Sequence, residues 1–284
     1  MLVLNSPTNQ NQLMMSLLDK DTLKTEILPF LPRPKRGESC SETLLLAILA
    51  LILYRLKTGC QWRELPISRY ISGKYSYKSV FYHFSRWSKL DIWQAIWLHL
   101  LRTHRDKLNL HTLQLDGTHT RTRGAIEKSA FQRRKGGKTS NLRCLCDEKG
   151  VLLAFSAVQA GNHHDLYDIV AQFEQMLAQL TAIGIRLEGL ILNADAGFDS
   201  LELRNLCEQY GLEVNIKLNP RNGKIQDRNE YFDPEFYQHR FVIERTFGEL
   251  YGFKALVIRY DKTARNWLNF NILGFIIKTI KKFK

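Results

Sequence analysis

The chain has 284 residues, of which 44% are hydrophobic and 24% charged, so wholesale disorder is excluded and two globular domains are possible. Its 41 Lys and Arg against 28 Asp and Glu give a formal net charge of +13. Such an excess points first to a polyanion, most often nucleic acid, and second to an anionic membrane surface.

The sequence gives little support to a membrane protein. An apolar run over residues 44–54 is far shorter than the ~20 residues that a spanning helix needs. The N-terminus has no basic stretch ahead of an apolar one, so we expect no signal peptide. An odd, scattered set of cysteines is typical of reduced thiols in the cytoplasm. The set comprises Cys40, Cys60, Cys144, Cys146 and Cys207, of which the third and fourth should pack on one side of a strand.

Helical patterns fill residues 1–108. Ser39 and Glu42 form a capping box for an apolar helix that runs to about Lys57. Residues 76–89 predict a second helix, and a third begins with Asp91 as its N-cap. We expect these helices to form a domain of their own, with the following side chains in its core: Val80, Phe84, Trp87, Trp93, Ile96, Trp97, Leu100 and Leu101.

The helix predicted over residues 76–89 has a basic and aromatic outer face. Its residues Lys78, Tyr82, Arg86 and Lys89 fall away from the apolar stripe. Such a face suits a helix-turn-helix that lies in the major groove of DNA. The same pattern is typical of a helical bundle with a solvated basic side, and this segment alone leaves both interpretations open.

From Thr112 the hydrophobic pattern changes from helical to alternating. Residues 112–123 are rich in Thr and predict a strand, and residues 141–161 predict a hairpin around the turn at 147–150. Strands and helices then follow one another. This order predicts an α/β domain over residues 109–284, in which helices cover the faces of a mixed sheet. The remaining elements expected are a helix over 165–184, a strand ending at Asp195, a helix over 199–210, a strand over 212–218, and helices over 237–251 and 267–280.

Two aspartates end predicted strands of this sheet. Asp116 and Asp195 each follow an apolar stretch, and open sheets place their ligands at the carboxyl ends of strands. Two carboxylates from neighbouring strands make a hard oxygen site suited to Mg²⁺ or Mn²⁺, although either could be an ordinary loop residue. A third aspartate, Asp199, has a simpler explanation, because with Glu202 it forms a capping box for the next helix.

The helix predicted from Tyr237 offers a third carboxylate. Tyr237, Arg240 and Glu244 are spaced three and four residues apart, and Phe247 and Tyr251 continue the same face. Arg240, one turn before Glu244, can hold a partly buried glutamate in its charged form. The two can equally form an ordinary contact on the side of a helix, and spacing alone does not decide.

Adjacent histidines precede the helix predicted over residues 165–184. His163 and His164 are poor candidates for a transition-metal site, because adjacent histidines seldom share one ion. We interpret Asp165 as the N-cap of the helix, with Asp168 as its partner in a capping box. A DNA contact through His164 stays open.

Several blocks resemble those of the DDE transposases of bacterial insertion sequences, groups four and five. They are LDGTHTR, NADAGFDS, and YQHRFVIERTFGEL followed by IRYDKTARN. The last block fits the family's Tyr, two residues, Arg, three residues, Glu pattern at Tyr237, Arg240 and Glu244. CQWRELP and SVFYHFSRWSK are similar to the family's helical DNA-binding segment, so the resemblance covers about residues 40–275.

The resemblance implies a ribonuclease-H-like fold on which Asp116, Asp195 and Glu244 bind two Mg²⁺ or Mn²⁺ ions. Asp116 would bridge both ions, which would promote an in-line attack on a DNA phosphorus. The family's further Lys would fall at about Tyr251, and Lys254 is its candidate replacement. The short stretch between Asp195 and Glu244 leaves no room for the strand-rich insertion of some relatives.

Runs of Arg and Lys flank the three acids along the chain. Either run alone would be a solvated face, but beside the acids both are expected to hold DNA phosphates, including Arg143 and Arg259 within them. The residues predicted to bind double-stranded DNA are Lys78, Arg86, Arg121, Arg123, Arg133, Arg134, Lys135, Lys138, Tyr237, Arg240, Arg245 and Lys254.

Together these observations predict a DNA transposase that binds the terminal inverted repeats of its insertion sequence, cleaves the ends and joins them to target DNA. Joining two ends requires two active sites, so we expect a homodimer on DNA, in the bacterial cytoplasm with the nucleoid. Two alternatives remain: a metal-dependent nuclease that cleaves without joining, and a transposase-derived DNA-binding protein that has lost catalysis. The presence of all three acids counts against the second.

Overall fold

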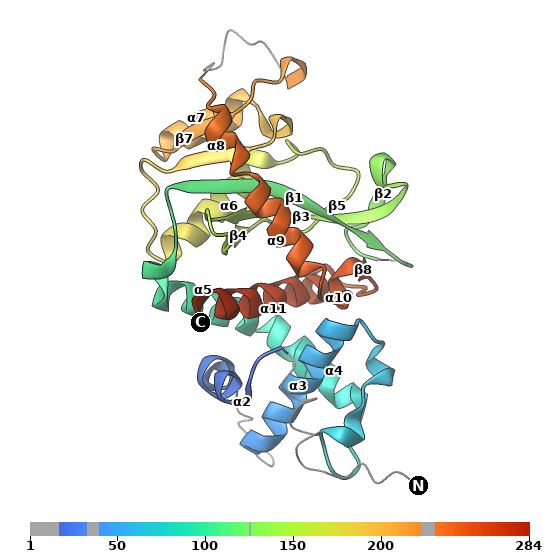
Figure 1. Cartoon of the computed structure of the whole chain (residues 1–284). Helices are drawn as coiled ribbons and strands as arrows, with labels where there is room; N and C mark the ends of the chain where they lie inside the picture. Colours follow the sequence, from blue (N-terminus) through green and yellow to red (C-terminus); the bar gives the residue numbers. More distant parts are fainter. Residues whose placement is uncertain (1–16, 33–39, 125, 223–230) are drawn as a thin grey trace.

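A computed structural model describes residues 17–32, 40–124, 126–222 and 231–284. Figure 1 shows a sheet with helices around it at one end of the molecule and the N-terminal helices at the other. The last helix of the chain, in red, runs between these two parts. The molecule is therefore an α/β body joined to a helical one.

The helical part is built from three helices and several short helical turns. Helix α3 (Glu42–Thr58) ends at Gly59, whose left-handed backbone (φ 68°) suits glycine. Ser41 caps α3 by accepting from the backbone N–H of Leu44 at 3.2 Å; Ser39, the predicted cap, lies outside the described residues. The other elements are α2 (Lys20–Thr22), turns at Leu23–Ile27, Leu28–Phe30, Trp62–Glu64, Ile67–Arg69 and Arg105–Lys107, and helices α4 (Tyr77–Lys89) and α5 (Ile92–Thr103).

Helices α4 and α5 confirm the predicted amphipathic pattern. Every side chain predicted for their core is buried, and Lys78, Tyr82 and Lys89 are exposed on the outer side of α4, with Arg86 half-buried. Asp91 takes the N-cap position of α5 but makes no capping hydrogen bond. Among the described residues no single helix is long and apolar enough to cross a membrane; α3 with the turns at Trp62–Arg69, bent by 117°, passes that test as a pair.

The sheet has the order β2-β3-β1-β6-β7, with β4 and β5 also paired to β3 and β8 to β1. β1 and β3 are antiparallel, as are β3 and β4, whereas β6 runs parallel to β1 and β7 parallel to β6. An antiparallel hairpin unit followed by two strands parallel to the first is the ribonuclease-H-like arrangement that was predicted. The strands are β1 (Thr112–Thr122), β2 (Ala130–Gln132), β3 (Gly137–Cys146), β4 (Leu152–Phe155), β5 (Gln159–Ala160), β6 (Ile191–Ala194), β7 (Glu213–Ile216) and β8 (Ile258–Arg259).

Two predicted helix starts in this part are wrong. Helix α6 (Ile169–Ala182) begins four residues after Asp165, and Asp168 holds its N-cap position with a left-handed backbone and no capping bond. Helix α7 (Leu201–Gln209) is capped by Ser200, which accepts from the N–H of Leu203 at 3.2 Å. The remaining helices are α8 (Pro234–Gln238), α9 (Phe241–Leu250), α10 (Lys254–Val257) and α11 (Ala264–Phe283).

The helix predicted over 237–251 is broken between α8 and α9. The carbonyl of Phe236 accepts from the side-chain amide of Asn193 at 2.9 Å and from the N–H of His239 at 3.1 Å. The next N–H, of Arg240, bonds to the carbonyl of Tyr237 at 3.1 Å. These three-residue bonds tighten the turn, and the helix restarts at Phe241.

Helix α11 joins the two parts of the molecule. Phe270 stacks on Phe84 of α4 with ring centroids 4.3 Å apart, and Phe275 lies 5.8 Å from Trp97 of α5. The buried apolar side chains of both parts form one continuous cluster. The division at residue 108 stays a prediction, and α11 packs across it. All five cysteines are free, and Cys144 and Cys146 are buried in β3 as expected.

Candidate active site

Asp116 and Asp195 leave neighbouring parallel strands at the same edge. The register of β1 and β6 ends with Leu115 beside Ala194, so the two aspartates are the next residues of each strand. Asp195 is exposed and has extended backbone, whereas Asp116 is half-buried and continues along β1 beside β3. Strand pairing therefore sets Asp116 and Asp195 side by side at this edge of the sheet, and a metal shared by their carboxylates stays a prediction.

The fold disfavours the charge on Asp116. Its side chain is 23% exposed, and burial raises its pKa to about 6. A 2.7 Å hydrogen bond from the N–H of Gly117 and the charge of Arg240 oppose this rise, while Glu244 and Asp165 add to it. A nearby cation would therefore stabilise the charged form of Asp116.

Arg240 is the cation that the site supplies. Its Nη1 lies 3.6 Å from Oδ2 of Asp116, and its Nη2 lies 2.7 Å from Oε1 of Glu244. The ring of Tyr237 lies 5.6 Å from the guanidinium carbon. Burial works against the charge of Arg240, but Tyr237 and three carboxylates raise its pKa above the ordinary value; they are Asp116, Glu244 and Asp195. Arg240 thus pairs with Asp116 and Glu244, and Asp195 acts on it through a longer-range charge interaction.

The described side chains do not form a ready-made metal site. No three of their His, Cys, Asp or Glu residues lie close enough together to hold one ion. Asp116, Asp195 and Glu244 nevertheless provide hard oxygen donors around a single guanidinium. A divalent ion that bound these carboxylates would take the place of Arg240 as their positively charged partner.

The position of the family's further Lys is taken by a structural tyrosine. The hydroxyl of Tyr251 shares a hydrogen bond with the hydroxyl of Thr118 on β1, which fastens the end of α9 to the strand that carries Asp116. Lys254 is exposed at the start of α10. Nothing in the contacts of Lys254 links it to the three acids, so its role as a replacement stays a prediction.

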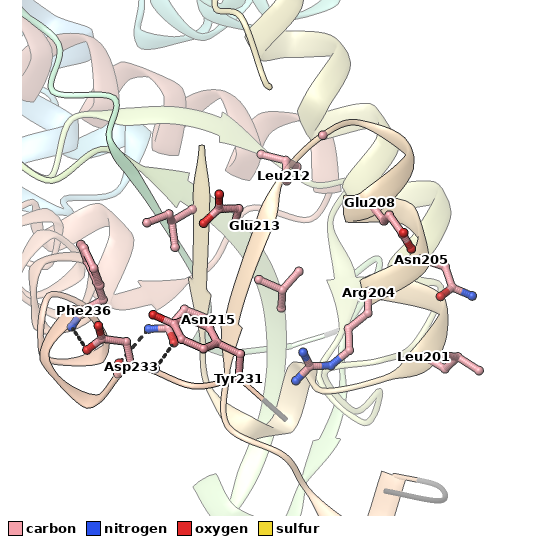
Figure 2. Close-up of a pocket in the computed structure, with 13 residues that line it drawn as sticks. Leu201, Arg204, Asn205, Glu208, Leu212, Glu213, Asn215, Tyr231, Asp233 and Phe236 are labelled. Carbon is pink, nitrogen blue, oxygen red and sulfur yellow. Dashed lines mark hydrogen bonds between the residues drawn. The ribbon is translucent and has the colours of Figure 1, made fainter. Parts of the chain in front are cut away.

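A ladder of buried amides holds α8, the short helix that precedes Arg240 and the start of α9. Asn193 of β6 donates to the carbonyl of Phe236, and Asn215 of β7 donates to the side-chain carbonyl of Asn193 at 2.8 Å. The N–H of Asp233 donates to Oδ1 of Asn215 at 2.7 Å, and the Asp233 carboxylate caps α8. Figure 2 shows Asn215 beside Asp233 in the wall of a cavity of about 640 Å³. Asn193 and Asn215 each stand among apolar residues of their strands, a signal for this ladder in the sequence, but their partners lie in a distant segment.

Asp199 is a structural residue, but not the helix cap that was predicted. Its side chain is fully buried, accepts from Nε of Arg204 at 2.9 Å and from the N–H of Asn219 at 2.6 Å. Arg204 in turn donates to the carbonyl of Ile216 at the end of β7. Asp199 therefore ties α7 to β7, which leaves Asp195 as the carboxylate of this loop that faces Arg240.

Asp165 lies close to the acidic site, which its interpretation as a helix cap did not anticipate. A Cβ atom on Gly197 would lie 2.8 Å from Oδ2 of Asp165, so the loop after β6 passes directly against this carboxylate. The segment that contains Asp165 is held by Arg143, whose Nη2 donates to the carbonyls of His164 and Tyr167 at 3.2 and 2.9 Å. His164 accepts from the N–H of Leu166, and the ring of His163 stacks on Tyr167.

Most of the predicted DNA-binding residues are exposed, but two arginines of the flanking runs are not. Arg143 is 1% exposed and Arg259 is fully buried, where it donates to Ser140 at 2.6 Å, so neither can reach a phosphate as they stand. Charge runs in the sequence do not distinguish these two from their neighbours. Exposed are Lys78, Arg121, Arg123, Arg133, Arg134, Lys135, Lys138, Arg245 and Lys254; Arg86, Tyr237 and Arg240 are partly buried.

Two family models match the chain. The model described as "Putative transposase of IS4/5 family" matches residues 21–97, and the model described as "Transposase DDE domain" matches residues 111–277, more than half of the chain. No relative among curated proteins matches.

Solved structures with some likeness are complexes of the Mos1 transposase. The Mos1 strand transfer complex is 11% identical, with a TM-score of 0.32, and covers 89% of this chain and 81% of that one. The Mos1 paired-end complex with the left transposon end is 12% identical, with a TM-score of 0.27, and covers 89% and 82%. At these scores the likeness carries no argument about this chain.

Proposed function

Because the chain belongs to the DDE transposase family of the IS4/5 type, we propose that it binds the ends of an insertion sequence, cuts them and joins them to target DNA. The observation that carries the proposal is that Arg240 pairs with Asp116 of β1 and Glu244 of α9, while Asp195 of the loop after β6 adds a longer-range charge interaction. Transposases of this family use divalent metal ions, and carboxylates are the ligands that Mg²⁺ and Mn²⁺ prefer.

The three acids would hold two divalent ions, which when bound activate the attacking hydroxyl and stabilise the leaving oxygen. Asp116 is best placed to hold both, since it stands on the central strand. Arg240 compensates the charges of Asp116 and Glu244, at 3.6 and 2.7 Å, and would compete with a metal for both.

Double-stranded DNA would be held by the exposed basic residues beyond the acids. Arg133, Arg134 and Lys135 form the turn between β2 and β3, and the guanidinium of Arg121 donates to the carbonyl of Lys135 at 2.6 Å. This contact fixes the basic turn against β1, the strand of Asp116. Phosphate contacts of this kind give affinity without sequence preference.

The test is cleavage of DNA that flanks the gene, with the protein in Mg²⁺. Asp116→Asn should lower the cleavage rate by at least ~10³-fold, because a charge aimed at the reacting centre is lost, while DNA binding persists. Asp106→Asn, an exposed aspartate in the turn after α5, is the matched control and should cleave normally. Cleavage by Asp116→Asn at the normal rate would make the acid assignment wrong.

The same reaction separates the alternatives. Products whose 3′-hydroxyl ends are joined to a second DNA support the transposase, whereas cut but never joined ends would favour a nuclease. Binding without any cleavage by the unaltered protein would favour a DNA-binding protein. We also propose a homodimer on DNA, and a mass of one protein per paired-end complex would contradict it.

A further inference from the structure

A cavity of about 1050 Å³ lies between the helical part and the loop after β8. One side is the end of α3 and the turn that follows it, with Arg55, Trp62 and Arg63. The other side is the loop that carries Tyr260 and Lys262. The active-site acids are not among its lining residues, so it is a separate feature of the molecule.

The inner wall holds an arginine with unused donors. Arg55 is 6% exposed, and its Nη2 lies 3.4 Å from Oδ1 of the buried Asp261. Its guanidinium lies 4.6 Å from the ring of Trp62 and 4.5 Å from that of Phe270. Its Nε and Nη1 have no hydrogen-bond partner among the described residues. Buried N–H groups without partners cost free energy. These two nitrogens have almost no accessible surface, so a ligand in the cavity does not meet them, and Arg55 acts by supporting the ring of Trp62, which lines the cavity.

The outer walls are aromatic. Phe81 is 38% exposed and packs edge-on against Trp62 with ring centroids 5.2 Å apart, while Tyr260 is 62% exposed on the opposite side. Tyr77 also lines the cavity, and the exposed Arg63 and Lys262 stand among its lining residues. Phosphates of a closed duplex need only surface cations, whereas aromatic faces bind bases that have left the stack.

The cavity is connected to the active site through the sheet. Tyr260 follows β8, which pairs with β1 at Arg121 and Thr122. Asp116 stands five residues before Arg121 on the same strand, which corresponds to about 17 Å. That is about half a turn of duplex DNA from Asp116 to the point where β8 pairs, and Tyr260 of the cavity is the next residue after β8.

We propose that this cavity binds an unpaired nucleotide of the DNA, with its base against the aromatic walls and its phosphate beside Arg63 and Lys262. The proposal rests on the proposed function, because it assumes that DNA is the substrate. Its chemistry is that of a single-stranded site, a flat aromatic surface beside cationic side chains. A free nucleotide has the same groups, but it lacks the affinity that the neighbouring duplex contributes.

The test compares a blunt duplex with the same duplex carrying a three-nucleotide unpaired tail, both in chelator so that no cleavage occurs. The unaltered protein should bind the tailed DNA about tenfold more tightly. Tyr260→Ala and Phe81→Ala should lose this advantage and keep their affinity for the blunt duplex. Tyr210→Ala, which removes a ring 40% exposed at the end of α7, is the matched control and should keep it.

Equal loss on blunt and tailed DNA would identify a duplex-backbone site and overturn the proposal. An unchanged tail advantage in both cavity variants would overturn it too. Strong competition by a mononucleotide at micromolar concentration would assign the cavity to a free nucleotide instead. Failure of the unaltered protein to bind either DNA would count against the proposed function itself. This outcome differs from failure of the cavity proposal, because it appears in the unaltered protein without any variant.

Discussion

At the residue scale, Asp116 is a carboxylate held where its charge is disfavoured. Burial raises its pKa from 3.8 to about 6. Because the folded-state value is the higher one, the unfolded chain releases this proton first, and the free energy of unfolding falls as pH rises from about 4 to 6. Asp116→Asn should therefore raise the free energy of unfolding of the metal-free protein at pH 7, by up to about 3 kcal/mol.

Urea unfolding in chelator at pH 7 and near pH 3.5 measures this effect. At the lower pH the natural residue is mostly protonated in both states, so the difference in stability between the two proteins should become small. Equal stability at pH 7 would mean that Arg240 fully compensates the carboxylate.

Arg240 competes with any metal for the same acids. Arg240→Gln should therefore bind Mn²⁺ at least about tenfold more tightly while cleaving more slowly, because a cation within 2.7 Å of Glu244 is removed. Arg245→Gln, an exposed arginine on the same helix, should leave both properties near normal. Mn²⁺ titration followed by electron paramagnetic resonance measures the affinity. Weaker Mn²⁺ binding by Arg240→Gln would show that the guanidinium orients the acids.

At the scale of elements, the amide ladder sets where α8 and α9 lie. Asn193→Leu leaves the Phe236 carbonyl and the Asn215 amide without this partner, at a cost of about 2–3 kcal/mol. Hydrogen exchange should become faster in α8, and cleavage should fall more than DNA binding. Gln114→Leu is the matched control, because Gln114 is fully buried beside Asn193 in the register but bonds to Thr112. Equal acceleration of exchange in α8 by both variants would contradict a positioning role.

Local patterns predict the elements of this fold well, and contacts between distant segments explain the rest. Asp116 and Asp195 could be predicted as neighbours because each ends an apolar stretch, and Arg240 and Glu244 because they are one turn apart. The break before α9 could not, since it depends on Asn193 from another strand. Ser200 rather than Asp199 caps α7 because Asp199 is drawn to Arg204.

The spacing of residues in the sequence also does not reveal which charged side chains are buried. Arg143 and Arg259 stand in basic runs, yet both turn inward, Arg143 to carbonyls of the loop before α6 and Arg259 to the hydroxyl of Ser140 on β3. Asp165, predicted to start a helix, instead packs against Gly197 beside the acids. Each of these outcomes depends on which segment lies opposite, which only the three-dimensional structure gives.

At the scale of the whole molecule, α11 completes the helical part. Residues 1–108 expressed alone should be aggregation-prone or loosely packed, because the aromatic surfaces of Phe84 and Trp97 lose their partners on α11. Addition of a peptide of residues 264–284 should restore a compact state. Size-exclusion chromatography and near-ultraviolet circular dichroism measure both, and a compact, monomeric fragment without the peptide would contradict the prediction.

The place of α11 in the chain has a consequence for synthesis of the protein. The ribosome makes α4 and α5 early and α11 last, so their aromatic faces must wait roughly ten to forty seconds for the helix that covers them. The N-terminal part therefore cannot finish folding before α11 has left the ribosome. We expect it to depend on chaperones or on rapid release until the last helix emerges, and a prematurely terminated chain should never reach a DNA-competent state.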